Sequence, residues 1–194
     1  MVDIKDVQKL REQTQAPIME CKKALEEAQG DLEKAKLILK KKGELRAEKK
    51  QAEETKEGII EAYIHSNKKV GVLVELRSQT DFVSLTAEFQ ELAHNIAMHI
   101  AAMNPRYISP DDIPAEEIER MKKEYLEELQ GSNKPPEIIE KIVQGKLEKE
   151  LQEVCLLKQP YIKDENKTIG DLLTEATAKF GEKIEVKRFV RFQI

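Results

Sequence analysis

The chain has 194 residues, of which 40% are hydrophobic and 36% charged, and its formal net charge is -4. This length suits one medium domain, or one domain with a small appendage, and the apolar content is sufficient for a core. Because acidic and basic residues are interleaved and not pooled, the charge pattern argues against direct nucleic-acid binding.

Hydropathy argues against a membrane protein. No stretch approaches the roughly 18 to 20 apolar residues of a membrane span, and residues 1–4 do not begin a secretion signal. We therefore expect a cytoplasmic protein. Its two cysteines, Cys21 and Cys155, lie on apolar faces of predicted helices without the spacing of a metal or redox pair, so we expect reduced core thiols.

The first fifty residues predict three short helices. Pro17 separates the first two because proline cannot continue the helical hydrogen bonds, Gly30 ends the second, and Asp31 caps the third. Their apolar stripes are Ile4, Val7 and Leu10; then Ile18, Cys21, Leu25 and Ala28; then Leu32, Ala35, Ile38 and Leu39. Beyond Gly43, the charged run 44–54 has few apolar residues and is predicted to be an exposed helical linker.

Two alternating patterns after the linker predict a β-hairpin. Apolar residues recur with period two, which is typical of half-buried strands, and residues 66–69 form the turn between them. The alternating residues are Ile60, Ala62 and Ile64 in the first strand and Val70, Val72, Val74 and Leu76 in the second.

The run Thr80-Asp81-Phe82-Val83 lies between the second strand and a long predicted helix. Asp81 and Phe82 can point outward together, presenting a carboxylate and an apolar wedge. Alternatively, Thr80, Asp81 or Ser84 caps the helix and Phe82 packs in the core. The helix is predicted from the apolar positions Leu85, Phe89, Leu92, Ile96, Ile100 and Met103. Its His94 and His99 are five residues apart, which does not suit a zinc site.

The second half of the chain predicts three helices and a final strand. The first helix spans 110–130, and residues 111–150 carry twelve acids against seven bases, which favours a solvated surface or, alternatively, a basic partner. Gly145 lies inside the next helix, suggesting close packing or a bend. Thr168 and Gly181 bound the last helix. The strand places Ile184, Val186, Arg188, Val190, Phe192 and Ile194 on one face, and Phe189 and Arg191 on the other.

These elements predict an α+β fold in which a three-stranded antiparallel sheet packs with helices. Phe189 on the uncovered sheet face leaves apolar surface open, so we expect a homodimer or a partner there. The sequence lacks a phosphate-binding glycine loop, metal-ligand spacing and a Ser-His-Asp order, so we expect neither an enzyme nor a cofactor.

Three motifs follow one another along the chain: residues 10–12, 19–25 and 30–31 with Lys42-Gly43 after them, residues 80–83, and the run 159–164 (Gln-Pro-Tyr-Ile-Lys-Asp). Together they resemble the motifs of bacterial elongation factor Ts in its compact form. The first resembles the N-terminal domain of that family, which is ubiquitin-associated-like in fold. The chain departs from the family at Gln15 and Pro17, where a glycine-bearing turn is usual.

The resemblance implies a guanine-nucleotide exchange factor for elongation factor Tu. It implies that Thr80, Asp81, Phe82 and Val83 bind the GTPase, with Asp81 and Phe82 entering it near the magnesium site. It also implies that the bundle contacts the GTPase through Met19, Lys22 and Lys23. Residues 1–52 would then be a docking domain with its linker helix, and 53–194 a core for dimerisation and elongation factor Tu binding. The alternative is a non-catalytic adaptor with a ubiquitin-associated-like domain.

Overall fold

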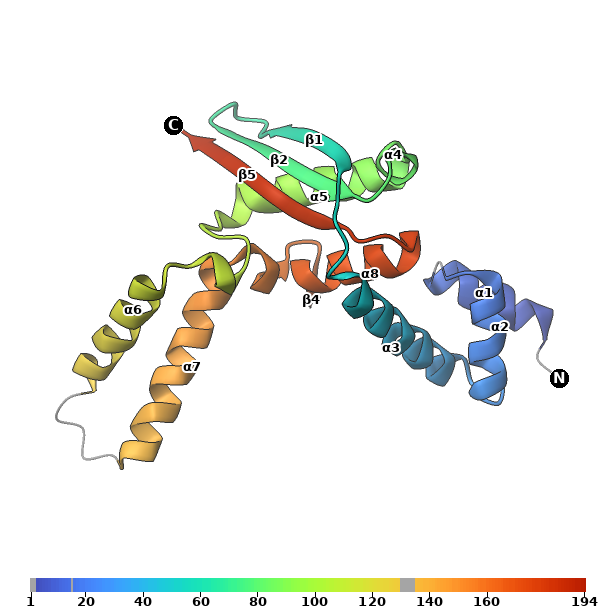
Figure 1. Ribbon diagram of the computed structural model, residues 1–194, viewed down its shortest axis with the longest axis horizontal. Helices are drawn as coiled ribbons and strands as arrows, with labels where there is room; N and C mark the ends of the chain where they lie inside the picture. The colour runs from blue at the N-terminus through green and yellow to red at the C-terminus, as the bar shows by residue number, and fades with distance from the viewer. Residues whose placement is uncertain (1–2, 15, 130–134) are drawn as a thin grey trace. The chain divides into compact units, whose positions relative to one another are not determined.

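The computed structural model describes residues 3–14, 16–129 and 135–194, and it confirms the α+β class (Figure 1). A three-stranded antiparallel sheet has the order β1-β2-β5, and β3 and β4 form a second, two-stranded sheet that was not predicted from the sequence. The elements are α1 (Ile4–Thr14), α2 (Ile18–Glu27), α3 (Leu32–Lys50), β1 (Glu57–Ile64), β2 (Val70–Ser78), α4 (Asp81–Ser84), α5 (Ala87–Met103), η1 (Pro110–Asp112), α6 (Ala115–Glu128), α7 (Pro136–Val154), η2 (Leu156–Lys158), β3 (Pro160–Tyr161), β4 (Asp164–Thr168), α8 (Ile169–Phe180) and β5 (Glu185–Gln193).

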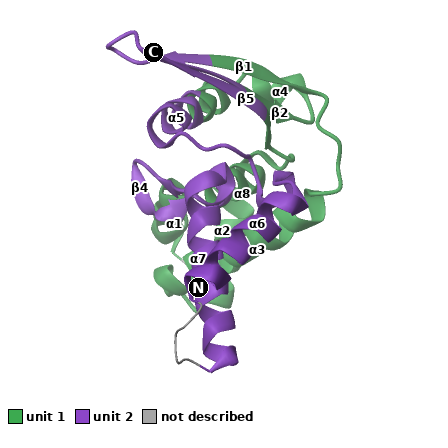
Figure 2. Cartoon of the chain, turned by 90° about the vertical axis from the view of Figure 1, so that its left-hand side faces the viewer, with its two compact units in different colours: residues 1–61, 75–93, 171–187 green, residues 62–74, 94–170, 188–194 purple. Residues whose placement is uncertain are grey.

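The chain forms two compact units, coloured separately in Figure 2. Unit 1 consists of residues 1–61, 75–93 and 171–187, and unit 2 of residues 62–74, 94–170 and 188–194. The three sheet strands each contribute residues to both units. Unit 1 therefore combines the N-terminal helices with α4, the start of α5 and most of α8.

The N-terminal bundle of unit 1 has its own core. Eight residues from α1 to α3 are buried together: Val7, Leu10, Cys21, Ala24, Leu25, Ala28, Ala35 and Leu39. Gly30 adopts a φ of +88° after α2, and the Asp31 carboxylate accepts hydrogen bonds from the N–H groups of Glu33 (3.0 Å) and Lys34 (3.1 Å), so both predicted boundaries are confirmed. Ile4 and Ile18, predicted in the core stripes, are exposed instead.

Helix α3 does not end near Gly43. It continues to Lys50, and a Cβ atom placed on Gly43 would lie 3.0 Å from the Cβ of Ala178 in α8. Ala47 is buried, and the Lys50 ammonium donates to the Gln79 side-chain oxygen at 3.4 Å. The helical linker predicted over residues 44–54 is thus helical as far as Lys50 and mostly exposed, but it is a continuation of α3 and buries Ala47. Because Gly43 has no side chain, it allows a close approach of α3 and α8.

The helix predicted after residue 83 is interrupted. One turn, α4, ends at Ser84, and α5 begins at Ala87, where the Thr86 hydroxyl accepts from the Phe89 N–H at 3.3 Å. Because of this break, Leu85 is exposed and does not join the buried stripe. Met103, at the other end, is also exposed, whereas the intervening apolar positions are buried as predicted.

Helices α6 and α7 of unit 2 pack side by side. Met121 and Val143 are buried in this pair, and Ile113, Val154 and Cys155 form a small core at its base. Gly145 has no atom within 4 Å of the position that a Cβ would take, so the expectation of close packing there is wrong.

Both cysteines are buried free thiols, as predicted. Burial raises the pKa of Cys21 and of Cys155, which favours the unreactive protonated form.

His99 of α5 is also buried in unit 2 and holds the Gln159 segment. Its Nδ1 atom accepts from the Ile162 N–H at 3.4 Å, so the Nε2 atom carries the proton that is shared with the Gln159 Oε1 at 3.0 Å. Burial lowers the pKa of His99, and the hydrogen bond with Gln159 partly offsets that effect. Gln159 in turn donates to the Glu153 carbonyl at 2.6 Å.

One sheet face of unit 2 carries exposed apolar side chains. The opposite face meets α5, because the Tyr63 ring lies 5.7 Å from that of His94 and the Arg191 guanidinium donates to the Ala101 carbonyl at 3.1 Å. Alternation then places Ile64, Leu73, Val190 and Phe192 on the open face, and all four are exposed.

The predicted faces of β5 are corrected by this arrangement. Lys187 and Arg188 are both exposed, so alternation breaks after the buried Val186. Arg191 and the partly buried Phe189 consequently lie on the helix-covered side. The open apolar face exists, but Phe192 forms part of it and Phe189 does not.

Residues 3–14, 16–129 and 135–194 contain neither a candidate membrane span nor a candidate metal site. None of the helices there is long and apolar enough to cross a bilayer. No group of three or more His, Cys, Asp or Glu residues is arranged to hold a metal ion there.

Candidate functional site

The 80–83 turn presents an aromatic ring to solvent. Phe82 is 84% exposed, so the interpretation that it packs in the core is wrong. Asp81 is exposed beside it at the first position of α4, whereas Val83 is buried beneath the turn. The turn therefore offers an anionic group and an apolar ring together, and Val83 supports them from inside.

Polar contacts fix the base of the 80–83 turn. The Glu182 carboxylate accepts from the Thr80 N–H at 3.0 Å and from the Thr80 hydroxyl at 2.6 Å. The Thr80 carbonyl accepts from the buried Ser78 hydroxyl at 2.9 Å. Although Thr80 occupies the N-cap position, its hydroxyl makes no capping bond to α4. Glu182 was not predicted from the sequence, because 102 positions separate it from Thr80.

Gln79 forms a second support beside the turn. Its side-chain oxygen accepts from the Lys183 N–H at 3.2 Å and from the Lys50 ammonium at 3.4 Å, and its amide nitrogen donates to Glu53. Lys50 also pairs with Glu53 at 2.9 Å, and this hydrogen bond lowers the pKa of Glu53. The end of α3 is thus connected to the residue that precedes Thr80.

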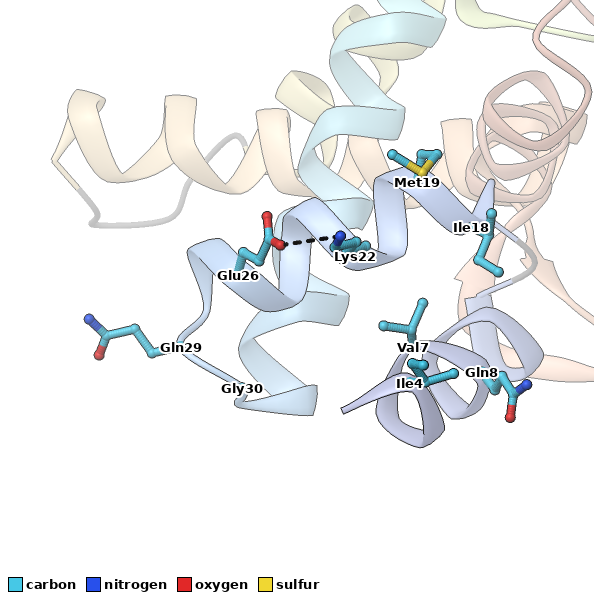
Figure 3. A pocket seen from close by; sticks show the side chains of 9 residues that line it. All are labelled: Ile4, Val7, Gln8, Ile18, Met19, Lys22, Glu26, Gln29 and Gly30. Atoms are coloured by element: carbon cyan, nitrogen blue, oxygen red, sulfur yellow. Dashed lines mark ion pairs between the residues drawn. The ribbon is translucent and has the colours of Figure 1, made fainter. Parts of the chain in front are cut away.

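A groove of about 710 Å³ opens between α1 and α2 of the bundle (Figure 3). Met19 is 61% exposed on its wall, so Met19 is not merely a core residue. Lys22 lies on the same wall and pairs with Glu26 at 4.0 Å. The residues that line the groove are Ile4, Val7, Gln8, Ile18, Met19, Lys22, Glu26, Gln29 and Gly30. The exposed Ile4 and Ile18 thus extend an apolar surface around Met19.

Lys23 faces a different hollow of about 420 Å³, formed by α2 and α3. Its neighbours there include Lys42, Arg46 and Lys49, and the one acid, Glu20, is paired with Arg46 at 2.5 Å. The three residues predicted on α2 therefore separate into an apolar groove with Met19 and Lys22, and a basic hollow with Lys23. The Gln15 turn lies outside the described residues.

The groove, the hollow and the 80–83 turn share one kind of surface chemistry. The groove and the hollow combine exposed apolar side chains with charged ones, and the 80–83 turn exposes Asp81 and Phe82. Surfaces of this chemistry suit contact with another protein, in which the apolar groups become buried and the rim charges set orientation.

Comparison with known proteins identifies the family. Residues 4–194 match the family model described as elongation factor TS. Elongation factor Ts of Thermosipho melanesiensis is 54% identical over 100% of this chain and 99% of its own length. The proteins of the same name from Thermodesulfovibrio yellowstonii and Thermotoga maritima are 57% and 53% identical, each over 97% of this chain and 94% of their own length. The chain therefore belongs to the elongation factor Ts family of translation elongation factors.

Proposed function

We propose that the chain binds elongation factor Tu in its GDP form and promotes release of the nucleotide. The observation that carries this proposal is the 84% exposure of Phe82 on a turn whose base is fixed by hydrogen bonds. Burial of an exposed ring by a partner lowers the free energy of the complex. Because the ring is not part of this protein's own core, it can make that contact without any loss of core packing. In this role the chain is not an enzyme but acts on one, and it needs no cofactor.

On this proposal Phe82 inserts into the GTPase near its magnesium site. Insertion displaces the groups that hold the nucleotide phosphates. The adjacent Asp81 carboxylate adds a negative charge that disturbs the charge balance between the magnesium ion and the phosphates. Thr80 and Val83 keep the two side chains in place. The coupling is reciprocal: if the factor weakens GDP binding by some ratio, GDP weakens binding of the factor by the same ratio, and GTP completes the cycle.

We assign the N-terminal bundle a docking role. Met19, with Ile4 and Ile18 beside it, would take an apolar segment of the GTPase, while Lys22 and Lys23 would contact acidic groups at its rim. The division into a docking region, residues 1–52, and a core, residues 53–194, is part of this proposal.

We also propose that the open sheet face forms a homodimer. Ile64, Leu73, Val190 and Phe192 expose neighbouring apolar side chains on one face of unit 2, and a second copy offers the same surface. The site of action would be the cytoplasm, where translation elongation takes place.

Nucleotide release from elongation factor Tu tests the exchange function. The GTPase is loaded with fluorescent GDP, and the signal is followed after mixing with excess unlabelled GDP, with and without this protein. We expect the protein to accelerate release. If it binds the GTPase but leaves the release rate unchanged, the adaptor interpretation is correct and the exchange function is not.

Substitution of one groove residue tests docking. Met19→Asp should weaken binding to elongation factor Tu, because it places a charge in an apolar contact. The control is Leu37→Asp, at an exposed apolar position of α3 that lines neither hollow. Equal affinities for the two variants would contradict the role of the groove.

Sedimentation tests the homodimer. The parent protein should sediment as a dimer at micromolar concentration, and Phe192→Asp should give monomers. Leu126→Asp, on the exposed side of α6, is the matched control and should remain dimeric. A monomeric parent would remove this proposal without affecting the exchange function.

A further inference from the structure

The direction of Phe82 is set by few apolar contacts. The ring is almost fully exposed, Leu85 at the other end of α4 is exposed as well, and Val83 is the one buried apolar residue of the 80–83 turn. Four helical residues are too few to be stable alone. The polar contacts of Thr80 and Gln79 must therefore supply much of the order in this turn.

Glu182 makes the most direct of those contacts. Both of its carboxylate oxygens are used, one by the Thr80 N–H and the other by the Thr80 hydroxyl. A charged acceptor that receives two hydrogen bonds from one residue fixes orientation as well as position. Thr80 immediately precedes α4, so this pair determines where the helix begins and which way its first residues face.

The end of α8 is built to deliver that carboxylate. Gly181 has a φ of +73°, which a residue with a side chain rarely adopts, and its N–H donates to the Thr177 carbonyl at 2.9 Å. The buried Thr177 hydroxyl then accepts from the Ile184 N–H at 3.1 Å. Glu182 is thus held between two fixed residues and is directed at Thr80.

We infer that Glu182 is a positioning residue for nucleotide exchange, acting through Thr80 to hold Phe82 in the orientation that enters the GTPase. This inference rests on the proposed exchange function and extends it to Glu182, which does not need to touch the GTPase to have this effect. A wedge ordered before binding does not have to be ordered during binding, so its loss of conformational freedom does not reduce the affinity. Removal of the Glu182 side chain should make the 80–83 turn less ordered, although the Phe82 ring itself is still present.

The test is a double-mutant cycle between Glu182 and Phe82. Glu182→Ala should slow the stimulated GDP release at least tenfold, and Glu182→Gln, which keeps one acceptor oxygen, should lie between it and the parent. In the Phe82→Ala background, Glu182→Ala should have little further effect, because the group that it positions is already absent. Hydrogen exchange of the amides at 81–83 should accelerate in Glu182→Ala.

Glu185→Ala is the matched control. Glu185 lies three residues further along, and its carboxylate accepts from Thr55 and pairs with Lys183 at 2.9 Å, whereas the hydrogen bonds of Thr80 go to Glu182. Its removal should leave amide exchange at 81–83 unchanged. A merely structural role of Glu182 predicts instead that Glu182→Ala slows release by the same factor in both Phe82 backgrounds, without a local change at 81–83.

The two hypotheses fail in different ways. If Phe82→Ala stimulates release as well as the parent does, the proposed function of the turn is wrong. If Phe82→Ala is impaired but Glu182→Ala matches the parent in release and in amide exchange, the wedge stands and the inference about Glu182 is overturned.

Discussion

Truncation of Phe82 separates a surface wedge from a structural residue. Because the side chain is 84% exposed, folding buries only about one sixth of it, or roughly 30 Å² of the 150 to 250 Å² that a buried aromatic side chain removes from water. At about 25 cal/mol per Å², Phe82→Ala should lower the free energy of unfolding by less than about 1 kcal/mol.

The same arithmetic gives the size of the effect on binding. If the GTPase buries the remaining roughly 170 Å² of the ring, the contact is worth up to about 4 kcal/mol. We expect Phe82→Ala to lose about 2 kcal/mol or more, as hot-spot residues do, which is a decrease of roughly 30-fold in binding to the nucleotide-free GTPase. Stimulated GDP release should fall correspondingly.

Phe89→Ala is the matched control, because it removes a phenyl ring of the same size from a buried position a few residues away. Phe89 is 0% exposed and its ring lies 6.1 Å from that of Phe180, so truncation should cost about 3 to 5 kcal/mol of stability. Each variant is measured by urea unfolding and by release of fluorescent GDP at a temperature where it is folded. A Phe82→Ala protein that unfolds as readily as Phe89→Ala, yet stimulates release at the parent rate, would refute this reasoning.

Three further substitutions test the packing described above. Gly145→Ala in α7 should raise the free energy of unfolding by up to about 1 kcal/mol, because alanine favours the helix and the added methyl meets no neighbour; a loss of stability would show a contact that the structure lacks. Gly43→Leu should lower it by about 1 to 3 kcal/mol through overpacking against Ala178, and urea unfolding of both glycine variants gives the contrast. For His99, the folded pKa lies below its ordinary value of 6.5, so the unfolded chain binds more protons and stability should fall as the pH drops below about 6.5. His99→Gln should flatten this decline between pH 7.5 and 5.5, and parallel losses in parent and variant would contradict the role of His99.

Local patterns predicted most of the elements but not how some of them meet. Asp31, Gly30 and Gly181 act within a few residues, so their roles as cap and stops are confirmed. Glu182 could not be found in this way, because its contact with Thr80 depends on the path of α8 and β5.

Period-two and charge patterns were misleading where burial is one-sided. In β1, Ile64 lies on the open face of the sheet, whereas Tyr63, which alternates with it, faces α5. Likewise, Ala47 lies in a charged run but is buried. In both cases burial is decided by the element that packs against the residue, and the local sequence period does not identify that element.

The unbroken α3 fixes the angular phase of the bundle within unit 1. Each residue of a helix adds 1.5 Å and about 100° of rotation. Deleting or inserting a single residue between Gly43 and Lys50 would therefore turn either the bundle or the Lys50 contact by more than a quarter of a circle. A flexible connection would tolerate such insertions and deletions, but a continuous helix does not. The groove that Met19 lines therefore has a fixed orientation relative to Gln79, which Lys50 contacts.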